Sequence, residues 1–158
     1  MKAVAIEATF VNAWLDEELR PRLDQVLAGR NFEQGQRAFT KARCMECHRI
    51  AGEGGSTGHD LTGVASRFTR EDLLDSILEP SKEISDQYQD YEILTTDGIL
   101  LVGNIEGRTV DTVTLRTQPP AEVLHEIHVD DIEIQRPHPL SRMPAGLLNV
   151  LTMDEVLD

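Results

Sequence analysis

The stretch Cys44-Met45-Glu46-Cys47-His48 contains both cysteines of this 158-residue chain. A Cys-x-x-Cys pair has three common interpretations: a redox-active dithiol, half of a zinc site, or a haem-attachment site. The histidine after the second cysteine favours the third, because in Cys-x-x-Cys-His two thiols add across the haem vinyl groups while the adjacent imidazole ligates the iron. Two thioethers and one axial ligand must come from one tight turn. The sequence therefore predicts covalent haem at Cys44 and Cys47, with His48 as an iron ligand.

The two other interpretations of the cysteine pair fit the surrounding sequence less well. A dithiol of the thioredoxin type follows a buried strand, whereas residues 32–42 have a helical pattern and a glycine-rich loop follows the motif. A structural zinc ion needs two more ligands at short spacing. His125 and His128 are three residues apart in a strand-like stretch, and His138 stands alone. Haem attachment is the preferred interpretation, and the zinc and dithiol interpretations stay open as alternatives.

Composition and charge exclude several classes of function. The chain has 28 acidic and 15 basic residues and a formal net charge of −13, which opposes binding to nucleic acid or to an anionic membrane surface. No apolar stretch approaches the roughly 18 residues of a membrane span. Aromatic residues make up 4% of the chain, so we expect haem, a large apolar group, to fill part of the core. The acidic excess lies in residues 71–136, whereas residues 31–70 are slightly basic.

Helix-capping signals mark the segments on both sides of the motif. Asn31 precedes an expected helix that ends near Ala42, and the pairs Thr69/Asp72 and Thr152/Glu155 have capping-box spacing. Residues 1–29 carry leucines at helical spacing that Pro21 interrupts, so we expect a peripheral, broken helical extension. That extension lacks the pattern of a signal peptide.

From Tyr88 onward the apolar residues alternate, as in strands. Asp97-Gly98 and Gly107-Arg108 are expected turns between these strands. The pattern predicts four or five short strands, enough for a small antiparallel sheet or barrel. We therefore expect a β-rich insertion over residues 88–137 that interrupts a haem domain formed by residues 30–87 and 138–158.

A second axial ligand is sought among the methionines, because a thioether is a common partner of histidine on haem iron. Met1 is terminal, Met45 lies inside the attachment turn, and Met153 has the pattern of a core residue. Met143 lies in an irregular loop, where a thioether is free of helical constraint, and we predict it as the distal ligand. His59, in the glycine-rich loop, is the main rival.

Together these features resemble the c-type cytochromes, and more narrowly the haem-binding domain found in planctomycete and verrucomicrobial proteins. The resemblance runs from Asn31 to Leu157 and is carried by five segments: Gly35-x-x-x-Phe39, Cys44-Met45-Glu46-Cys47-His48, Gly58-His59-Asp60-Leu61-Thr62-Gly63, Glu79-Pro80-Ser81 and Ser141-Arg142-Met143-Pro144-Ala145-Gly146-Leu147-Leu148. It implies a mainly α fold, a class I cytochrome c-like helical haem domain interrupted by a small antiparallel β-sheet or barrel. It also implies that Gly35 and Phe39 cross the C-terminal helix.

Two departures from the family pattern affect these expectations. The family usually has Gly-Pro-Asp-Leu where this chain has Gly58-His59-Asp60-Leu61. In cytochromes c the carbonyl of that proline accepts the N–H of the proximal histidine, and a backbone carbonyl at His59 would still do so. The family's last helix also runs longer than one ending at Asp158, so a shortened chain or a homodimer contact is expected.

The resulting hypothesis is a monohaem c-type cytochrome domain with one haem c per chain, which transfers single electrons and is not an enzyme. Its expected partner is a redox protein or a fused dehydrogenase domain, with no nucleic acid and no membrane span in this chain. Haem attachment implies a periplasmic or otherwise extracytoplasmic location, with a signal sequence upstream. The alternatives are a haem-based sensor or peroxidase-like domain with open iron, and an assembly module that docks through the β insertion.

Overall fold

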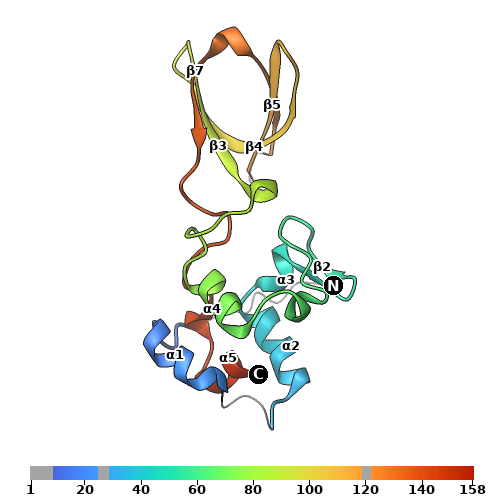
Figure 1. Ribbon diagram of the computed structural model, residues 1–158, viewed down its shortest axis with the longest axis vertical. Coiled ribbons are helices and arrows are strands. Elements are labelled where there is room, and N and C mark those ends of the chain that lie inside the picture. The colour runs from blue at the N-terminus through green and yellow to red at the C-terminus, as the bar shows by residue number, and fades with distance from the viewer. Residues whose placement is uncertain (1–8, 25–28, 119–121) are drawn as a thin grey trace. The chain divides into compact units, whose positions relative to one another are not determined.

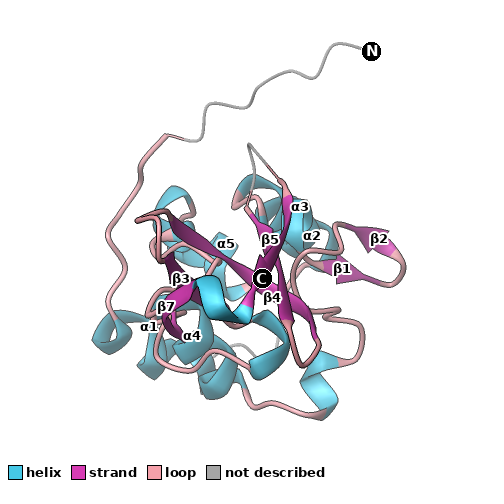
Figure 2. Ribbon diagram, turned by 90° about the horizontal axis from the view of Figure 1, so that it is seen from above, coloured by secondary structure: helices cyan, strands magenta, loops and turns pink. Residues whose placement is uncertain are grey.

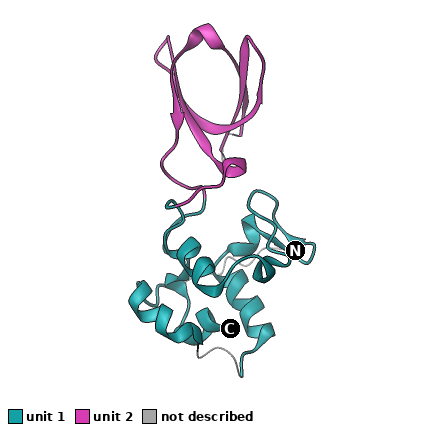
Figure 3. Ribbon diagram, viewed as in Figure 1, with its two compact units in different colours: residues 1–82, 143–158 teal, residues 83–142 magenta. Residues whose placement is uncertain are grey.

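The computed structural model describes residues 9–24, 29–118 and 122–158. The chain divides into two compact units (Figure 3). Unit 1 comprises Met1–Lys82 and Met143–Asp158, and unit 2 comprises Glu83–Arg142. The expected β-rich insertion, residues 88–137, falls inside unit 2.

Unit 1 contains the α-helices, which are all short (Figure 2). They are α1 (Asp16–Leu23), α2 (Phe32–Lys41), α3 (Cys44–Cys47), α4 (Arg70–Leu78) and α5 (Met153–Leu157), together with the 3₁₀ turns η2 (Val64–Ser66) and η5 (Leu147–Val150). The caps expected from the sequence are confirmed. The Asn31 side chain accepts hydrogen bonds from the backbone N–H groups of Glu33 and Gln34 in α2, and capping boxes begin α4 at Thr69 and α5 at Thr152. These side chains satisfy donors that a helix leaves without internal partners.

The core of unit 1 is aliphatic and includes the N-terminal segment. Its buried residues are Leu19, Leu23, Ala38, Ala42, Leu74, Leu148 and Leu151. We expected residues 1–29 to be peripheral, but Leu19 of α1 has no exposed surface, because α1 turns its leucines towards this core. Pro21 lies within α1 without splitting it. Residues 1–8 and 25–28 of that segment lie outside the described residues.

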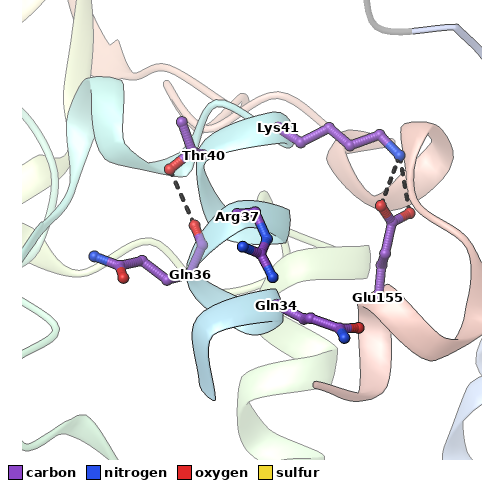
Figure 4. Close-up of a pocket in the computed structure, with 6 residues that line it drawn as sticks. All are labelled: Gln34, Gln36, Arg37, Thr40, Lys41 and Glu155. Carbon is purple, nitrogen blue, oxygen red and sulfur yellow. Dashed lines mark hydrogen bonds and ion pairs between the residues drawn. The ribbon is translucent and has the colours of Figure 1, made fainter. Parts of the chain in front are cut away.

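Gly35 allows α2 to approach α5 closely. A Cβ added at Gly35 would lie 2.7 Å from the carbonyl oxygen of Asp158, so only a glycine fits without a shift. At the same crossing, Lys41 Nζ lies 2.9 Å from each carboxylate oxygen of Glu155 (Figure 4). The hydrogen bond from Lys41 lowers the pKa of Glu155. The pair therefore stabilises the fold at neutral pH, and this contribution is lost as the pH falls through the lowered pKa.

Unit 2 is a five-stranded antiparallel sheet in the order β6-β5-β4-β3-β7. Its elements are η3 (Asp86–Tyr88), β3 (Asp90–Thr95), β4 (Leu100–Arg108), β5 (Thr112–Thr117), β6 (Leu124–His128), η4 (Val129–Asp131) and β7 (Ile132–Pro137). The sheet curls into an open barrel (Figure 1). Alternate residues of its strands meet in a separate core formed by Ile93, Val113, Leu115 and Ile127.

Of the two turns expected in unit 2, one is confirmed and the other is wrong. Asp97-Gly98 joins β3 to β4, with Gly98 at a φ of 85°. The turn expected at Gly107-Arg108 is wrong, because both residues belong to β4. The register of β4 against β5 shifts between Ile105 and Gly107. A bulge of this kind interrupts the alternation, so the strand continues where the pattern suggested its end.

The expected fold class, a mainly α class I cytochrome interrupted by a minor β element, is wrong. The chain is a mixture of helices and strands, and unit 2 has a sheet and a core of its own. The helices of unit 1 are also brief, since α3 has four residues and α5 has five. Among the described residues, no helix is long and apolar enough to cross a membrane.

We expect Gly35→Ala to destabilise unit 1, because the new methyl group would collide with the Asp158 carbonyl. Overpacking of this kind costs about 1–3 kcal/mol, more than the roughly 1 kcal/mol that alanine gains over glycine in a helix. Urea unfolding followed by circular dichroism measures the effect. Gln36→Ala, at the exposed neighbouring position, is the control. A Gly35→Ala protein as stable as the wild type would contradict the close crossing.

Candidate functional site

The Cys-x-x-Cys-His motif forms a single tight turn. Helix α3 spans Cys44–Cys47, and the backbone N–H of His48 donates to the carbonyl of Cys44 at 2.9 Å. Arg43 has a left-handed φ of 65°, which separates this turn from the end of α2. Cys44 is partly buried against the core of unit 1, while Cys47 is exposed. The structure thus brings both thiols and the imidazole together in one turn.

The orientation of the His48 ring is fixed by a backbone contact. Its Nδ1 lies 2.9 Å from the carbonyl oxygen of His59. A carbonyl only accepts hydrogen bonds, so Nδ1 carries the proton and Nε2 keeps its lone pair for a metal. The structure therefore has the contact expected for the carbonyl of His59. The His59 side chain is itself exposed.

Although much of this side chain is exposed, the partial desolvation of its imidazole and the neighbouring His48 lower the pKa of His59. Its imidazole is therefore neutral at pH 7, with a lone pair. In the structure, His59 contacts His48 through its backbone carbonyl, which accepts the Nδ1 proton.

The glycine-rich loop after the motif packs its backbone directly on the turn. A Cβ added at Gly54 would lie 2.2 Å from the carbonyl oxygen of His48, and one added at Gly55 would lie 2.2 Å from that of Glu46. The backbone N–H of Gly55 also donates to the carbonyl of Met45 at 2.8 Å. No side chain fits in these contacts, so the glycines are required for the turn to be held by the loop.

Gly58 makes the corresponding contact with the imidazole. A Cβ added there would lie 2.9 Å from Cε1 and 3.0 Å from Nδ1 of the His48 ring. The backbone N–H of Gly58 donates to the carbonyl of Cys47 at 2.9 Å. The loop that supplies the His59 carbonyl is therefore tied to the motif one residue earlier.

A short hairpin sets the direction of this loop. β1 (Arg49–Ile50) pairs with β2 (Glu53–Gly54), and positive φ angles at Ala51 and Gly52 form the turn between them. Arg49 also bridges to Asp60, beyond the loop. The chain thus leaves the motif, reverses, and returns past the His48 ring.

The sequence predicts this loop but does not indicate the role of its glycines. The close spacing of these glycines directly after a Cys-x-x-Cys-His motif is the sequence feature that could have indicated close packing of the loop on the motif. The contacts themselves depend on how the loop folds back, which the pattern does not show.

Burial raises the pKa of the Cys44 thiol to about 11. At neutral pH this group is a protonated thiol rather than a thiolate. Thiolate is the attacking form in disulfide exchange, so this shift makes Cys44 a poor attacking group.

Met143, the predicted distal ligand, lies outside the turn but in the same compact unit. It is half-buried in the irregular segment before η5. The three other histidines belong to unit 2: His125 and His128 in β6, and His138 after β7. In the described part of the chain, no three His, Cys, Asp or Glu side chains are grouped to hold a metal ion.

A hollow of about 610 Å³ lies on α2 and α5. Figure 4 shows its six lining residues, which are Gln34, Gln36, Arg37, Thr40, Lys41 and Glu155. This lining has no thiol, thioether or imidazole, so it offers none of the usual attachment points or axial ligands of haem c. The donor set that fits haem is the one in the α3 turn, with two thiols and an imidazole nitrogen free to bind iron.

We expect Gly58→Ala to displace the His48 ring and weaken its bond to His59. In the wild-type protein the Nδ1 proton is held by the carbonyl and should exchange slowly with water. Nuclear magnetic resonance of the imidazole proton should show faster exchange in the variant. Gly107→Ala is the control, because a Cβ there meets its nearest neighbour at 3.7 Å. Unchanged exchange in Gly58→Ala would show that the ring is not held as described.

In the protein without haem, we expect iodoacetamide to modify Cys47 before Cys44. A pKa of about 11 for Cys44, against an ordinary value of 9.0, reduces its thiolate fraction at pH 8 by about 100-fold. The rate at Cys44 should rise with pH up to about 11. Mass spectrometry of the Cys44→Ser and Cys47→Ser variants separates the two sites, and faster modification of Cys44 would contradict its burial.

Comparison with known families supports the chemistry of this turn. The sequence model of the family Cytochrome c matches residues 32–96, less than half of the chain but including the α3 turn, the glycine-rich loop and His59. A search of curated proteins found no match. Cytochromes c bind covalently attached haem c and transfer electrons. Residues 32–96, which contain the α3 turn, are therefore similar to the c-type cytochromes.

Proposed function

We propose that this chain is a monohaem electron-transfer domain with haem bound by thioether bonds to Cys44 and Cys47. His48 is the proximal ligand and Met143 the distal ligand. The observation that carries the proposal is the bond from His48 Nδ1 to the His59 carbonyl, since it leaves Nε2 as the ligating nitrogen. Haem held in this way supplies a reversible one-electron couple.

In this proposal, different residues of unit 1 attach, ligate and orient the haem. The two cysteines fix its position covalently, and the α3 turn sets the imidazole beside them. The His59 carbonyl accepts the Nδ1 proton and so increases the basicity of the ligating nitrogen. Gly58 leaves room for the ring, because a Cβ at this position would lie 2.9 Å from its Cε1 atom.

The choice of Met143 rests on its surroundings and its chemistry. It lies in unit 1, half-buried and free of helical geometry, whereas Met153 begins α5 and packs against the core. A thioether opposite histidine raises the reduction potential of the iron. Two strong ligands also leave no open position for substrate chemistry, which suits electron transfer rather than catalysis.

His59 motivated the alternative of a sensor or peroxidase-like domain, because it replaces a proline in the family pattern. Its carbonyl nevertheless bonds to the proximal imidazole, so the departure leaves that part of the site intact. This supports the electron-transfer proposal over the sensor.

The partner in this proposal is a redox protein or a fused dehydrogenase domain. Thioether attachment of haem c is carried out outside the cytoplasm, so the proposal includes a periplasmic or otherwise extracytoplasmic location. The net charge of −13 does not define the partner's charge, because most of the acidic excess lies outside residues 31–70.

Met143→Ala tests the ligand assignment. The variant should keep covalent haem, lose the absorption band of an iron–methionine bond, bind carbon monoxide when reduced, and have a lower potential. Visible spectra and a redox titration measure these changes. Met153→Ala, which removes another half-buried methionine, is the matched control. If His59→Ala opens the iron while Met143→Ala does not, His59 is the distal ligand instead.

A further inference from the structure

Residues 11–14, which we call the strap, precede α1 and lie along η5. The first two backbone N–H groups of the strap both donate to the carbonyl of Asn149, at 2.7 and 3.2 Å. The indole N–H of Trp14 donates to the carbonyl of Leu151 at 3.0 Å, and its backbone N–H donates to Oδ1 of Asn149 at 3.4 Å. These hydrogen bonds join the strap to η5 and to the residue that follows it.

The strap is itself anchored in unit 1. Trp14 is half-buried and packs against the aliphatic core of this unit. The helix that continues the strap, α1, contains the fully buried Leu19, and Arg20 of α1 bonds to Asp75 of α4. Because the strap leads into an anchored helix, it is a fixed support for η5 rather than a loose extension.

Asn149, which the strap holds, also closes the turn that follows Met143. The backbone N–H of Asn149 donates to the carbonyl of Gly146 at 3.0 Å. Gly146 has a left-handed φ of 78°, and a Cβ added there would lie 2.9 Å from Nδ2 of Asn149. Pro144 lies between Met143 and this turn, and its ring fixes its own φ. The chain between Met143 and the residue held by the strap is therefore short and conformationally restricted.

The attachment turn packs on the same core as η5. Leu148 of η5 and the adjoining Leu151 are buried in the core of unit 1, and Cys44 packs against that core. Met143 belongs to the same compact unit. The support that the strap gives to η5 therefore acts inside the unit that contains the Cys-x-x-Cys-His turn.

We propose that the strap positions Met143 as the distal ligand by holding η5 in place, so that Trp14 is a positioning residue of the haem site. The proposal rests on the ligand assignment made above. A segment fixed at Asn149 leaves the thioether fewer competing conformations, so ordering it on the iron costs less. The strap precedes residues 32–96, which the Cytochrome c family model matches, so this support comes from outside the matched residues.

The test uses the full haem-loaded chain with Trp14→Phe, which keeps an aromatic ring but removes the N–H that bonds to Leu151. The variant should keep covalent haem but show a weaker iron–methionine band and a lower potential. The fraction of reduced protein that binds carbon monoxide should rise about fivefold, the equilibrium factor expected for one lost hydrogen bond. Amide hydrogen exchange at residues 143–149 should become faster.

Val11→Pro tests the strap without changing Trp14. Proline has no backbone N–H, so this variant loses the bond from residue 11 to the carbonyl of Asn149. It should change the band, the potential and carbon monoxide binding in the same direction as Trp14→Phe.

Asn31→Ala is the control for general stability. It removes the side chain that caps α2, and the strap makes no bond to that side chain. The expected loss of stability is close to that of one hydrogen bond. The control should keep the wild-type iron–methionine band and potential, even where urea unfolding shows that it has lost as much stability as the strap variants.

The outcomes separate this proposal from the ligand assignment. An unchanged band and unchanged carbon monoxide binding in both strap variants, with Met143→Ala still opening the iron, would overturn the strap's role alone. Loss of the band in Asn31→Ala to the same extent would also overturn it, because the general stability of unit 1 would then be sufficient. If Met143→Ala changes nothing, the ligand assignment and the strap's role fail together.

Discussion

The hydrogen bond from His48 Nδ1 to the carbonyl of His59 is the constraint on which the haem site depends. It determines which imidazole nitrogen is free for iron, and it requires the loop to return past the ring. That return is close enough that a Cβ at Gly58 would collide with the imidazole, and one at Gly54 or Gly55 would collide with the backbone of the motif. The same hydrogen bond thus accounts for the orientation of His48, for its tautomer and for the glycines of the loop that returns past its ring.

The two proposed axial ligands are supported by different local structures. His48 is held within a short stretch of sequence, by a turn and the loop that follows it. Met143 follows a five-stranded sheet whose first strand is tied to the residue just before the methionine.

Features encoded by neighbouring residues could be predicted from the sequence. The caps at Asn31 and Thr69 and the turn at Asp97-Gly98 are of this kind. The extent of the β structure was underestimated, because the five segments that carried the family resemblance all lie outside residues 88–137. The burial of Leu19 and the pairing of Asp90 with Arg142 are tertiary contacts. Helical spacing shows neither what a leucine packs against nor which of many charged residues meet.

The central claim is that haem is bound covalently in the α3 turn. The most direct measurement is the mass and visible spectrum of the purified protein after denaturation, with the chain produced in cells able to attach haem c. One haem should remain on each wild-type chain and none on the Cys44→Ala, Cys47→Ala double variant. Haem that leaves the denatured wild-type chain, or stays on the double variant, would contradict the account.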